Sequence, residues 1–533
     1  MVYYKLVFAI FFLPLTIIAY QIFPKRFRWV LLLLASMGYY FTFSVINFVF
    51  PLATAATTYG IGLALGKLSK NKKEKLGELK GAENKEKKAL VRAKYQRLSR
   101  IVLTLGILAL LACLLHLKYY GFFAENINKL FGGTAESGVM PQLSLVLPLG
   151  ISFYTMQAIS YMVDVYWEKI PAEKNPFKLL LFLCFFPTII EGPIALYKDI
   201  REDLFAGHSI IPQNIIRGYT RLAWGVMKKL VIADRLAPAV TVLFDVDRGT
   251  KGAEVVAAAV VYTIMEYMDF SACMDMVIGC AIIFGVKLPE NFRQPFLARN
   301  ASEFWRRWHI TLGVWFKTYI FYPVSMSGLA KRWGKFAKGR VNKHMTRMVA
   351  SAMALLPVWV CNGLWHGPKW TYIVYGLFYF VVIVLELLLE PVGDKILELL
   401  HTSKENKVVN VIRIIKTWII IFLGELIFKA DNLTEGIRML RSIGDGFTPA
   451  ILWNGTALNW RLDVYDWLVV LVMLIVVLVV NIIREKGIDV TEVLIKKPLI
   501  LRWALVLSLL LVIAIFGLYG PGFEEVDLVY AGF

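Results

Sequence analysis

A histidine between two apolar stretches is the residue of this sequence best suited to acid–base chemistry. His366 lies in the run 360–368, where glycines flank a Trp-His pair and a proline follows. The run predicts a helix broken at membrane depth, which is tolerated only where the backbone packs in protein or lines a cavity. Histidine has an unperturbed pKa near neutrality, so His366 could take a proton from a hydroxyl group. Taken alone, the run favours a structural histidine hydrogen-bonded in a helix break over a catalytic base.

A second histidine, His309, lies in a segment rich in tryptophan and arginine. The run from Asn300 to Glu303 has the form of a capping box, so a helix is expected over 303–316. On that helix His309 would share a face with Arg306, while the aromatic side chains form a different face. The aromatic residues and arginines also fit a helix that lies in the membrane interface. A histidine in such a segment needs a hydrogen-bond partner or a cavity.

Three carboxylates at membrane depth, Glu266, Asp269 and Asp275, form a further candidate cluster. Asp275 is four residues from Ser271 on the same helix face, whereas Asp269 lies on a different face. The cluster could relay protons or cations. A buried, hydrogen-bonded cluster that packs helices together explains the same residues equally well.

Signatures of metal and nucleotide chemistry are missing from the sequence. The five cysteines include no C-x-x-C pair, so neither a disulfide framework nor a zinc site is expected. There is no H-E-x-x-H motif and no glycine-rich phosphate-binding motif. We therefore expect no catalytic metal and no tightly bound cofactor.

The elements that must position these residues are membrane helices. Hydrophobic residues make up 58% of the 533 and the mean hydropathy is +0.60, which predicts an all-α, polytopic membrane protein. About eleven apolar stretches have the length needed to cross a bilayer. They fall at 3–22, 28–43, 44–66, 101–119, 143–165, 253–285, 346–360, 371–390, 411–429, 465–482 and 502–519.

The net charge of +20 follows membrane topology and does not indicate nucleic-acid binding. The segment 67–100 holds thirteen Lys and Arg against four Glu, and 331–347 holds seven with no acid. Such loops lie on the cytoplasmic side, next to anionic lipid. The segment 67–100 is expected to be a solvated helix because its glutamates and lysines are often three or four residues apart.

Two regions do not fit a simple series of spans. The apolar stretch 177–190 is too short to cross and ends in a Glu-Gly-Pro turn, which predicts a re-entrant or interfacial hairpin. The stretch 286–323 mixes apolar patches with many charges. Charges at that density must be buried in protein, lie in the interface or line a wet cavity.

Several runs together resemble the bacterial membrane-bound O-acyltransferases (MBOAT). The branch that this sequence most resembles includes the alginate O-acetyltransferase membrane subunit and the teichoic-acid D-alanyltransferase. The runs occur in the family's order, at 148–155, 186–194, 268–276, 288–296, 304–309 with 315–316, and 362–367. The chain end and the long basic loop 67–100 depart from the branch.

The resemblance implies one membrane domain over 1–533, with the signature-bearing core at 148–367 and the basic loop 67–100 in the cytoplasm. It implies a multi-pass protein of the bacterial cytoplasmic membrane, with transmembrane and re-entrant helices around a central funnel. The implied activity moves an acyl group, most commonly acetyl, from a cytoplasmic thioester such as acetyl-CoA or an acyl carrier. The implied acceptor is a cell-surface polysaccharide, reached through an extracytoplasmic SGNH-type partner.

The resemblance also assigns site residues. The family's essential histidine corresponds to His366, which would act as general base, and its second histidine to His309. The residues expected along the substrate path are Trp305, Arg306, Arg307, Trp308, Asn362, Trp365 and Asp269.

Alternatives from the same residues remain open. One is D-alanyl transfer to teichoic acid, and another is a lipid- or protein-directed acyltransferase, against which the bacterial-type motifs argue. A proton-coupled transporter or flippase would use the broken segments as a gate and Asp269, Asp275 and the histidines as a relay. Transporters usually show internal repeats, and the sequence contains none that we detect.

Overall fold

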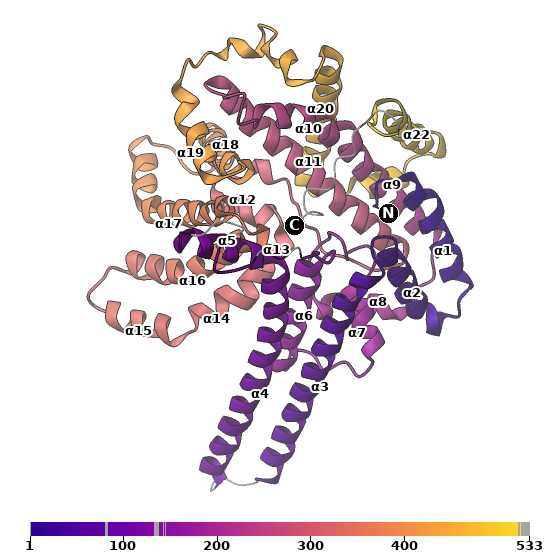
Figure 1. Ribbon diagram of the computed structural model, residues 1–533, viewed down its shortest axis with the longest axis vertical. Coiled ribbons are helices and arrows are strands. Elements are labelled where there is room, and N and C mark those ends of the chain that lie inside the picture. The colour runs from indigo at the N-terminus through magenta and orange to yellow at the C-terminus, as the bar shows by residue number, and fades with distance from the viewer. Residues whose placement is uncertain are drawn as a thin grey trace. The chain divides into compact units, whose positions relative to one another are not determined.

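The computed structural model describes residues 2–79, 84–132, 138–141, 143, 145–520 and 523, and within these ranges the secondary structure is helical, with no strand (Figure 1). The chain divides into two compact units. The first comprises residues 1–218 and 280–289, and the second comprises 219–279 and 290–533. Each unit contains part of the core predicted at 148–367.

Seven helical segments among the described residues are long and apolar enough to cross a membrane: Ile46–Glu78, Lys85–Leu130, Ala253–Ile283, Lys343–His366, Trp370–Leu399, Val464–Glu485 and Leu499–Phe516. They confirm the predicted class of polytopic all-α membrane protein. The count of eleven is not confirmed, because the four other predicted stretches form shorter or more polar helices. These are Val7–Ile22, α2 (Arg28–Phe41), α6 (Ile151–Tyr166) and α18 (Lys407–Lys429).

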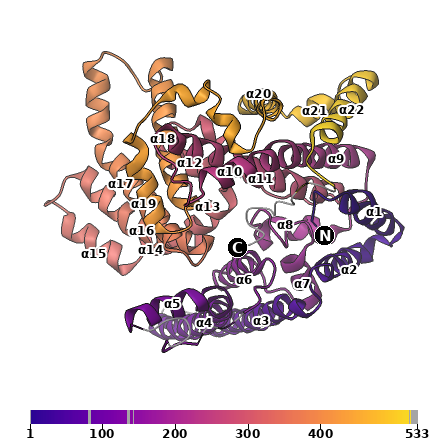
Figure 2. The same cartoon turned by 45° about the horizontal axis from the view of Figure 1, so that its top comes forward.

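The first unit is organised around a helical hairpin. Its long arms, α3 (Val49–Glu78) and α4 (Lys85–Leu114), lie side by side in both views (Figures 1 and 2). The basic segment 67–100 was predicted to be one solvated helix; its described residues instead form the ends of two helices, α3 up to Glu78 and α4 from Lys85. The unit's other helices are η1 (Val7–Phe12), α1 (Leu13–Ile22), η2 (Lys25–Phe27), α2, η3 (Ile46–Phe48), η5 (Leu115–Tyr119), α5 (Tyr120–Leu130), α6, α7 (Pro176–Cys184) and α8 (Tyr197–Ala206), with α9 (Pro212–Met227) running on into the second unit.

The re-entrant segment predicted near 177–190 consists of the short helix α7 followed by irregular, buried backbone. Buried irregular backbone needs hydrogen-bond partners from the protein itself. Phe186 N–H donates to Ser36 Oγ at 3.0 Å, and the Phe186 carbonyl accepts from the Tyr3 hydroxyl at 2.9 Å. Gly150 has a φ of 73°, and a Cβ there would meet the Ile189 carbonyl oxygen at 1.9 Å. Only glycine therefore fits at this contact with the re-entrant backbone.

The second unit holds both predicted histidines. Its helices are η6 (Lys228–Ala233), α10 (Asp234–Leu243), α11 (Ala253–Ile283, up to residue 279), η7 (Pro295–Leu297), α12 (Ala301–Arg307), α13 (Ile310–Phe316), η8 (Lys317–Phe321), α14 (Tyr322–Ser325), α15 (Gly328–Ala337), α16 (Lys343–His366), α17 (Trp370–Leu399), α18, α19 (Leu433–Arg441), η9 (Ser442–Gly444), η10 (Pro449–Leu452), η11 (Thr456–Trp460), α20 (Val464–Glu485), α21 (Val490–Ile495) and α22 (Leu499–Phe516). Helices α16 and α17 pack directly against each other, and α17 packs against α18 (Figure 1).

Two carboxylates of α11, Asp269 and Asp275, lie in buried ion pairs with lysines that directly follow α9. Lys229 Nζ contacts Asp269 Oδ1 at 2.7 Å and Asp234 Oδ1 at 2.9 Å. Lys228 Nζ contacts Asp275 Oδ2 at 2.8 Å and donates to Ser271 Oγ at 2.7 Å. The pairing of Asp275 with Ser271 agrees with their predicted common face, and both bind the same lysine. Paired in this way, Asp269 and Asp275 join helices within the second unit.

Candidate active site

The helix predicted over 303–316 is interrupted at His309. Helix α12 ends at Arg307, and α13 begins at Ile310. Between them His309 has a φ of 45°, a left-handed conformation that is uncommon for any residue except glycine. The prediction of one continuous helix was therefore wrong, although Asn300 does cap its start, accepting from Glu303 N–H at 2.7 Å. Strained backbone of this kind persists where the surroundings hold it, and it is frequent at functional sites.

Asn291 holds the interruption in place from an earlier part of the chain. Its carbonyl oxygen accepts from Ile310 N–H at 2.9 Å. Its side-chain Oδ1 accepts from Thr311 N–H at 3.1 Å and from Thr311 Oγ1 at 2.8 Å, and lies 3.1 Å from Nδ1 of His309. An amide oxygen only accepts hydrogen bonds, so Nδ1 of His309 must carry the proton. Nε2 is then the ring nitrogen with the basic lone pair.

Burial keeps His309 in this neutral form. The side chain is 3% exposed, and burial lowers its pKa to about 3. A buried imidazole loses the solvation that stabilises its charged form. At physiological pH His309 is therefore a hydrogen-bond acceptor through Nε2.

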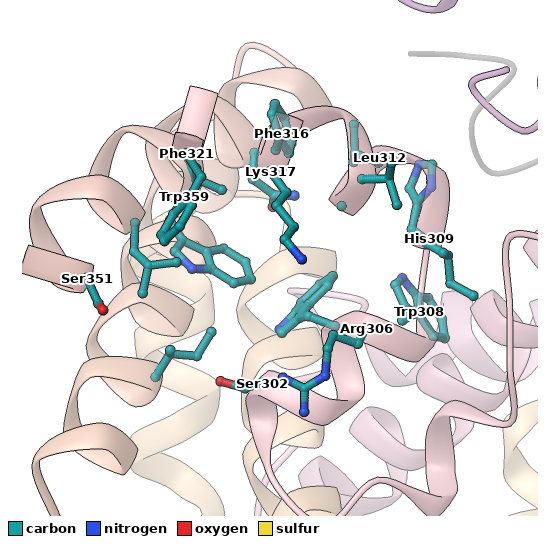
Figure 3. A pocket seen from close by; sticks show the side chains of 18 of the residues that line it. Ser302, Arg306, Trp308, His309, Leu312, Phe316, Lys317, Phe321, Ser351 and Trp359 are labelled. Atoms are coloured by element: carbon teal, nitrogen blue, oxygen red, sulfur yellow. The ribbon is translucent and has the colours of Figure 1, made fainter. Parts of the chain in front are cut away.

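His309 lines a pocket of about 550 Å³ within the second unit. Five of the predicted substrate-path and catalytic residues lie on its wall: Trp305, Arg306, Trp308, His309 and Asn362. The rest of the wall is mainly apolar, with contributions from α13, η8, α16 and α17. Figure 3 shows the ends of Lys317 and Arg306 over the same hollow, with Trp359 on one side and His309 on the other.

Three buried polar atoms on the pocket wall have no hydrogen-bond partner among the described residues. They are Nε1 of Trp305, Nε1 of Trp359 and Oδ1 of Asn362. Asn362 and Trp359 are each 5% exposed. Leaving such a group unsatisfied costs about 1–3 kcal/mol. Two donors and one acceptor are thus available to a ligand in the pocket.

His366 is the last residue of α16 and lies one turn after Asn362. The helix break predicted in the run 360–368 lies at the end of that run, because α16 continues to His366 and ends at Gly367, whose φ is 152°. His366 is 4% exposed and does not line the pocket. The Trp365 indole is near both histidines, with ring centroids 5.2 Å from His309 and 5.1 Å from His366. The structure thus brings together two histidines that are far apart in sequence.

The remaining predicted path residues lie away from the pocket wall. Arg307 binds Glu303 and Glu485, each at 2.9 Å. The Trp365 ring contacts both histidine rings, and Asp269 is paired with Lys229. Among the described residues, no group of three or more His, Cys, Asp or Glu is arranged to hold a metal ion.

Sequence reasoning missed three residues that shape this site: Asn291, Lys317 and Trp359. Asn291 is eighteen residues from His309, and no local pattern reveals such a hydrogen bond. Lys317 and Trp359 were present as a lysine in an aromatic segment and a tryptophan on an apolar helix. Both line the same pocket as His309 and Asn362. A comparison of which residues share a helix face with these two predicted residues could have suggested them.

Replacing Asn291 with alanine should destabilise the protein by about 3 kcal/mol, because several buried donors lose their acceptor. Thermal unfolding of the purified chain in detergent measures this loss. A matched control exists on an exposed loop, where Asn454 Oδ1 accepts from Thr456 N–H at 3.0 Å and Thr456 Oγ1 at 2.7 Å. Asn454→Ala should change stability by less than about 0.5 kcal/mol. Equal effects of the two substitutions would contradict the role given to Asn291.

Comparison with known proteins identifies the class. Residues 170–428 match the model of MBOAT, the membrane-bound O-acyltransferase family. A probable alginate O-acetylase AlgI from Pseudomonas aeruginosa is 30% identical over 445 residues, which are 83% of this chain and 75% of the relative. The chain therefore belongs to the membrane-bound O-acyltransferase family, and it is an O-acyltransferase of the membrane.

Two further relatives show the range of the family's acceptors. The peptidoglycan O-acetyltransferase of Helicobacter pylori is 29% identical over 374 residues, 64% of each chain. The teichoic acid D-alanyltransferase of Bacillus subtilis is 27% identical over 244 residues, 45% of this chain and 59% of the relative. The family assignment confirms the predicted enzyme class and favours it over the transporter alternative. Multi-pass localisation in the membrane agrees with the seven candidate spans.

Proposed function

We propose that this chain transfers an acetyl group from a cytoplasmic thioester toward a cell-surface polysaccharide, with His366 as general base. One observation carries the proposal: a single pocket gathers His309, Asn362 and three residues of the Trp305–Trp308 run beside the buried His366. The family assignment supplies the reaction class. The position of His366 suggests that its imidazole receives the proton of the acceptor hydroxyl.

In the proposed reaction neutral His366 removes the proton from the acceptor hydroxyl as its oxygen attacks the thioester carbonyl. The new C–O bond forms, the C–S bond breaks, and the thiolate leaves with the proton returned by the imidazolium. General-base assistance of this kind is typically worth about a hundred- to ten-thousandfold. Asn362, which lines the pocket one turn before His366, or a nearby backbone N–H stabilises the oxyanion through hydrogen bonding.

The pocket suits the pantetheine arm shared by acetyl-CoA and acyl carrier proteins. The arm's amides offer N–H donors to Asn362 Oδ1 and carbonyl acceptors to the indole N–H groups of Trp305 and Trp359. Arg306 and Lys317, both exposed at the pocket, are placed to bind phosphate. His309 accepts a hydrogen bond through Nε2 and so orients the donor. In this proposal the donor is a substrate and no bound cofactor is required.

The acceptor is proposed to be a polysaccharide, because relatives named for alginate and peptidoglycan acetylation match most of this chain. Matches to the D-alanyltransferases cover less than half of it, which favours acetyl over D-alanyl transfer. An extracytoplasmic partner of the SGNH type would complete delivery to the polymer. Co-purification of this chain with such a protein encoded beside it would test the partner.

Two adjacent arginines provide a direct test of the donor pocket. Arg306 lines the pocket and makes no ion pair with a described residue, whereas Arg307 binds Glu303 and Glu485 outside it. Vesicles containing the full chain and supplied with a polysaccharide acceptor should release free thiol from acetyl-CoA or from an acetylated carrier protein, and empty vesicles with the same acceptor should not. Arg306→Gln should raise the KM for the thioester about three- to tenfold with an unchanged Tm.

Arg307→Gln is the matched control in the same assay. It should lower the Tm by a few degrees because it removes a bridge between α12 and α20, with little change in KM. A raised KM in Arg307→Gln together with an unchanged KM in Arg306→Gln would show that the thioester binds outside this pocket. Absence of thiol release by the wild-type chain with both donors would contradict the proposed activity itself.

A further inference from the structure

A cavity in the first unit takes no part in the reaction described above. Its volume is about 740 Å³. It is formed by the turn between α1 and α2, the start of α7 and the end of α8, and these two helices pack against α2 (Figures 1 and 2). Three of the lining residues are cations, Lys25, Arg26 and Lys178, and none is an acid.

The positive charges of this cavity are not neutralised by carboxylates. None of the three cations forms an ion pair with a described residue. Lys178 Nζ lies 4.9 Å from the centre of the Phe205 ring and 5.8 Å from that of Trp29. The Arg26 guanidinium lies 5.6 Å from the centre of the Phe27 ring. Aromatic rings hold a cation without cancelling its charge, so the cavity suits an anionic ligand.

The turn that carries two of these cations is fixed by contacts with the end of α8. Arg28 is 7% exposed and donates to the carbonyl oxygens of His208 at 3.0 Å and Gly207 at 3.3 Å. Gly207 has a φ of 63°, and a Cβ there would meet the Lys25 carbonyl oxygen at 2.3 Å. The turn therefore packs closely on α8, and the positions of Lys25 and Arg26 do not depend on a ligand.

Contacts with α3 place the cavity near one surface of the membrane. In the apolar part of α3, Tyr59 donates its hydroxyl proton to the Lys174 carbonyl at 2.9 Å. In the basic part, Lys73 contacts Glu168 at 3.2 Å. The chain from Glu168 to Lys174 thus crosses the boundary between the two parts, and Asn175 on the cavity wall directly follows it. The basic end of α3 is predicted to be cytoplasmic, so the cavity belongs to that side.

Apolar side chains are exposed beside the cations. Ile22 is 76% exposed, Phe177 is 59% exposed and Phe27 is 49% exposed. Basic pockets next to membrane helices on the cytoplasmic side bind the headgroups of anionic lipids. A phospholipid matches both parts of this surface, with its phosphate at the cations and its acyl chains on the apolar side chains. A soluble acidic protein matches only the cations.

We propose that this cavity binds the phosphate of one anionic phospholipid, whose acyl chains lie against the exposed apolar side chains of α1 and α2. The cavity belongs to a different unit from the donor pocket. The proposal therefore does not depend on the function proposed above.

Native mass spectrometry of the full chain, titrated with lipid in detergent, measures this binding. The wild type should bind one phosphatidylglycerol at least about tenfold more tightly than phosphatidylcholine, whose choline group cancels the phosphate charge. A triple variant with Lys25→Gln, Arg26→Gln and Lys178→Gln should bind phosphatidylglycerol at least about tenfold more weakly than the wild type.

A second triple variant controls for the loss of net charge. Arg92, Lys94 and Arg97 are exposed on α4 and do not line the cavity. Their replacement by glutamine removes the same three charges and should leave the affinity for phosphatidylglycerol within about twofold of the wild type. Equal losses of affinity in the two triple variants would overturn the proposal.

Tests on the wild type alone are also decisive, so the proposal does not depend on the folding of any variant. Equal affinities for phosphatidylglycerol and phosphatidylcholine would overturn it. Soluble glycerol phosphate and an acyl carrier protein should not displace phosphatidylglycerol. Displacement by glycerol phosphate at the lipid's own concentration would show a site for free phosphate, and displacement by the carrier protein would show a protein-docking surface. Either result would contradict a lipid site.

Discussion

Vesicles that contain His366→Ala should transfer acyl groups about a hundred- to ten-thousandfold more slowly than vesicles with the wild-type chain. Alanine removes the nitrogen that takes the proton from the acceptor, while the pocket wall at His309 and Asn362 remains. The loss should therefore appear in kcat, and the KM for the thioester should change little. Thiol release from acetyl-CoA, measured with and without a polysaccharide acceptor, gives both constants.

A matched histidine substitution controls for expression and folding. His401 is exposed in the turn after α17 and has a φ of 48°. His401→Asn keeps a residue that tolerates this conformation, and it should leave kcat and Tm unchanged. If His366→Ala retained more than about a tenth of the wild-type kcat, a role as general base would be contradicted.

Gly376→Ala should destabilise the protein by about 3 kcal/mol, which is a large part of a typical stability. Helices α16 and α17 pack so closely that a Cβ at Gly376 would meet the Trp359 carbonyl oxygen at 2.3 Å. On the facing helix, a Cβ at Gly363 would meet the Tyr372 carbonyl oxygen at 2.4 Å. Neither carbonyl belongs to a flexible side chain, so the helices must move apart. Separation would also displace Trp359 and Asn362 from the pocket.

Another glycine of the same helix isolates this effect. Gly393 lies on α17, and a Cβ there would meet no atom within 4 Å. Gly393→Ala should stabilise the protein by about 0.5–1 kcal/mol, because alanine suits a helix better than glycine. Thermal unfolding in detergent compares the two variants directly. A Tm for Gly376→Ala at or above that of the wild type would show that the helices do not pack as described.

The residues of the site could be predicted from sequence more readily than their geometry. His366 and His309 were selected as polar residues in apolar and aromatic surroundings, and the family resemblance gave them roles. The glycines around His366 suggested a helix break, but Gly363 serves close packing against α17 and the helix ends at Gly367. Sequence alone does not distinguish a glycine that ends a helix from one that admits a neighbouring helix.

Long-range contacts account for most of the remaining differences. The aromatic spacing across 303–316 continues through the interruption at His309, so periodicity predicted one helix. The interruption depends on hydrogen bonds from Asn291. Apolar length also overestimated the number of spans, because the predicted stretches at Val7–Ile22, α2, α6 and α18 are apolar but form helices that are shorter or more polar than the seven candidate spans.

The proposed function is the supply of acetyl groups to a surface polysaccharide by chemistry at His366. Cells that lack the native gene would be given the wild-type chain or His366→Ala at matched protein levels, with isotopically labelled acetate as the acetyl source. The measurement is the amount of labelled O-acetyl ester on purified surface polysaccharide. We predict label with the wild type and a loss of at least about a hundredfold with His366→Ala. Equal labelling by both chains, or the absence of label from the polymer in cells with the wild-type chain, would contradict the proposed function.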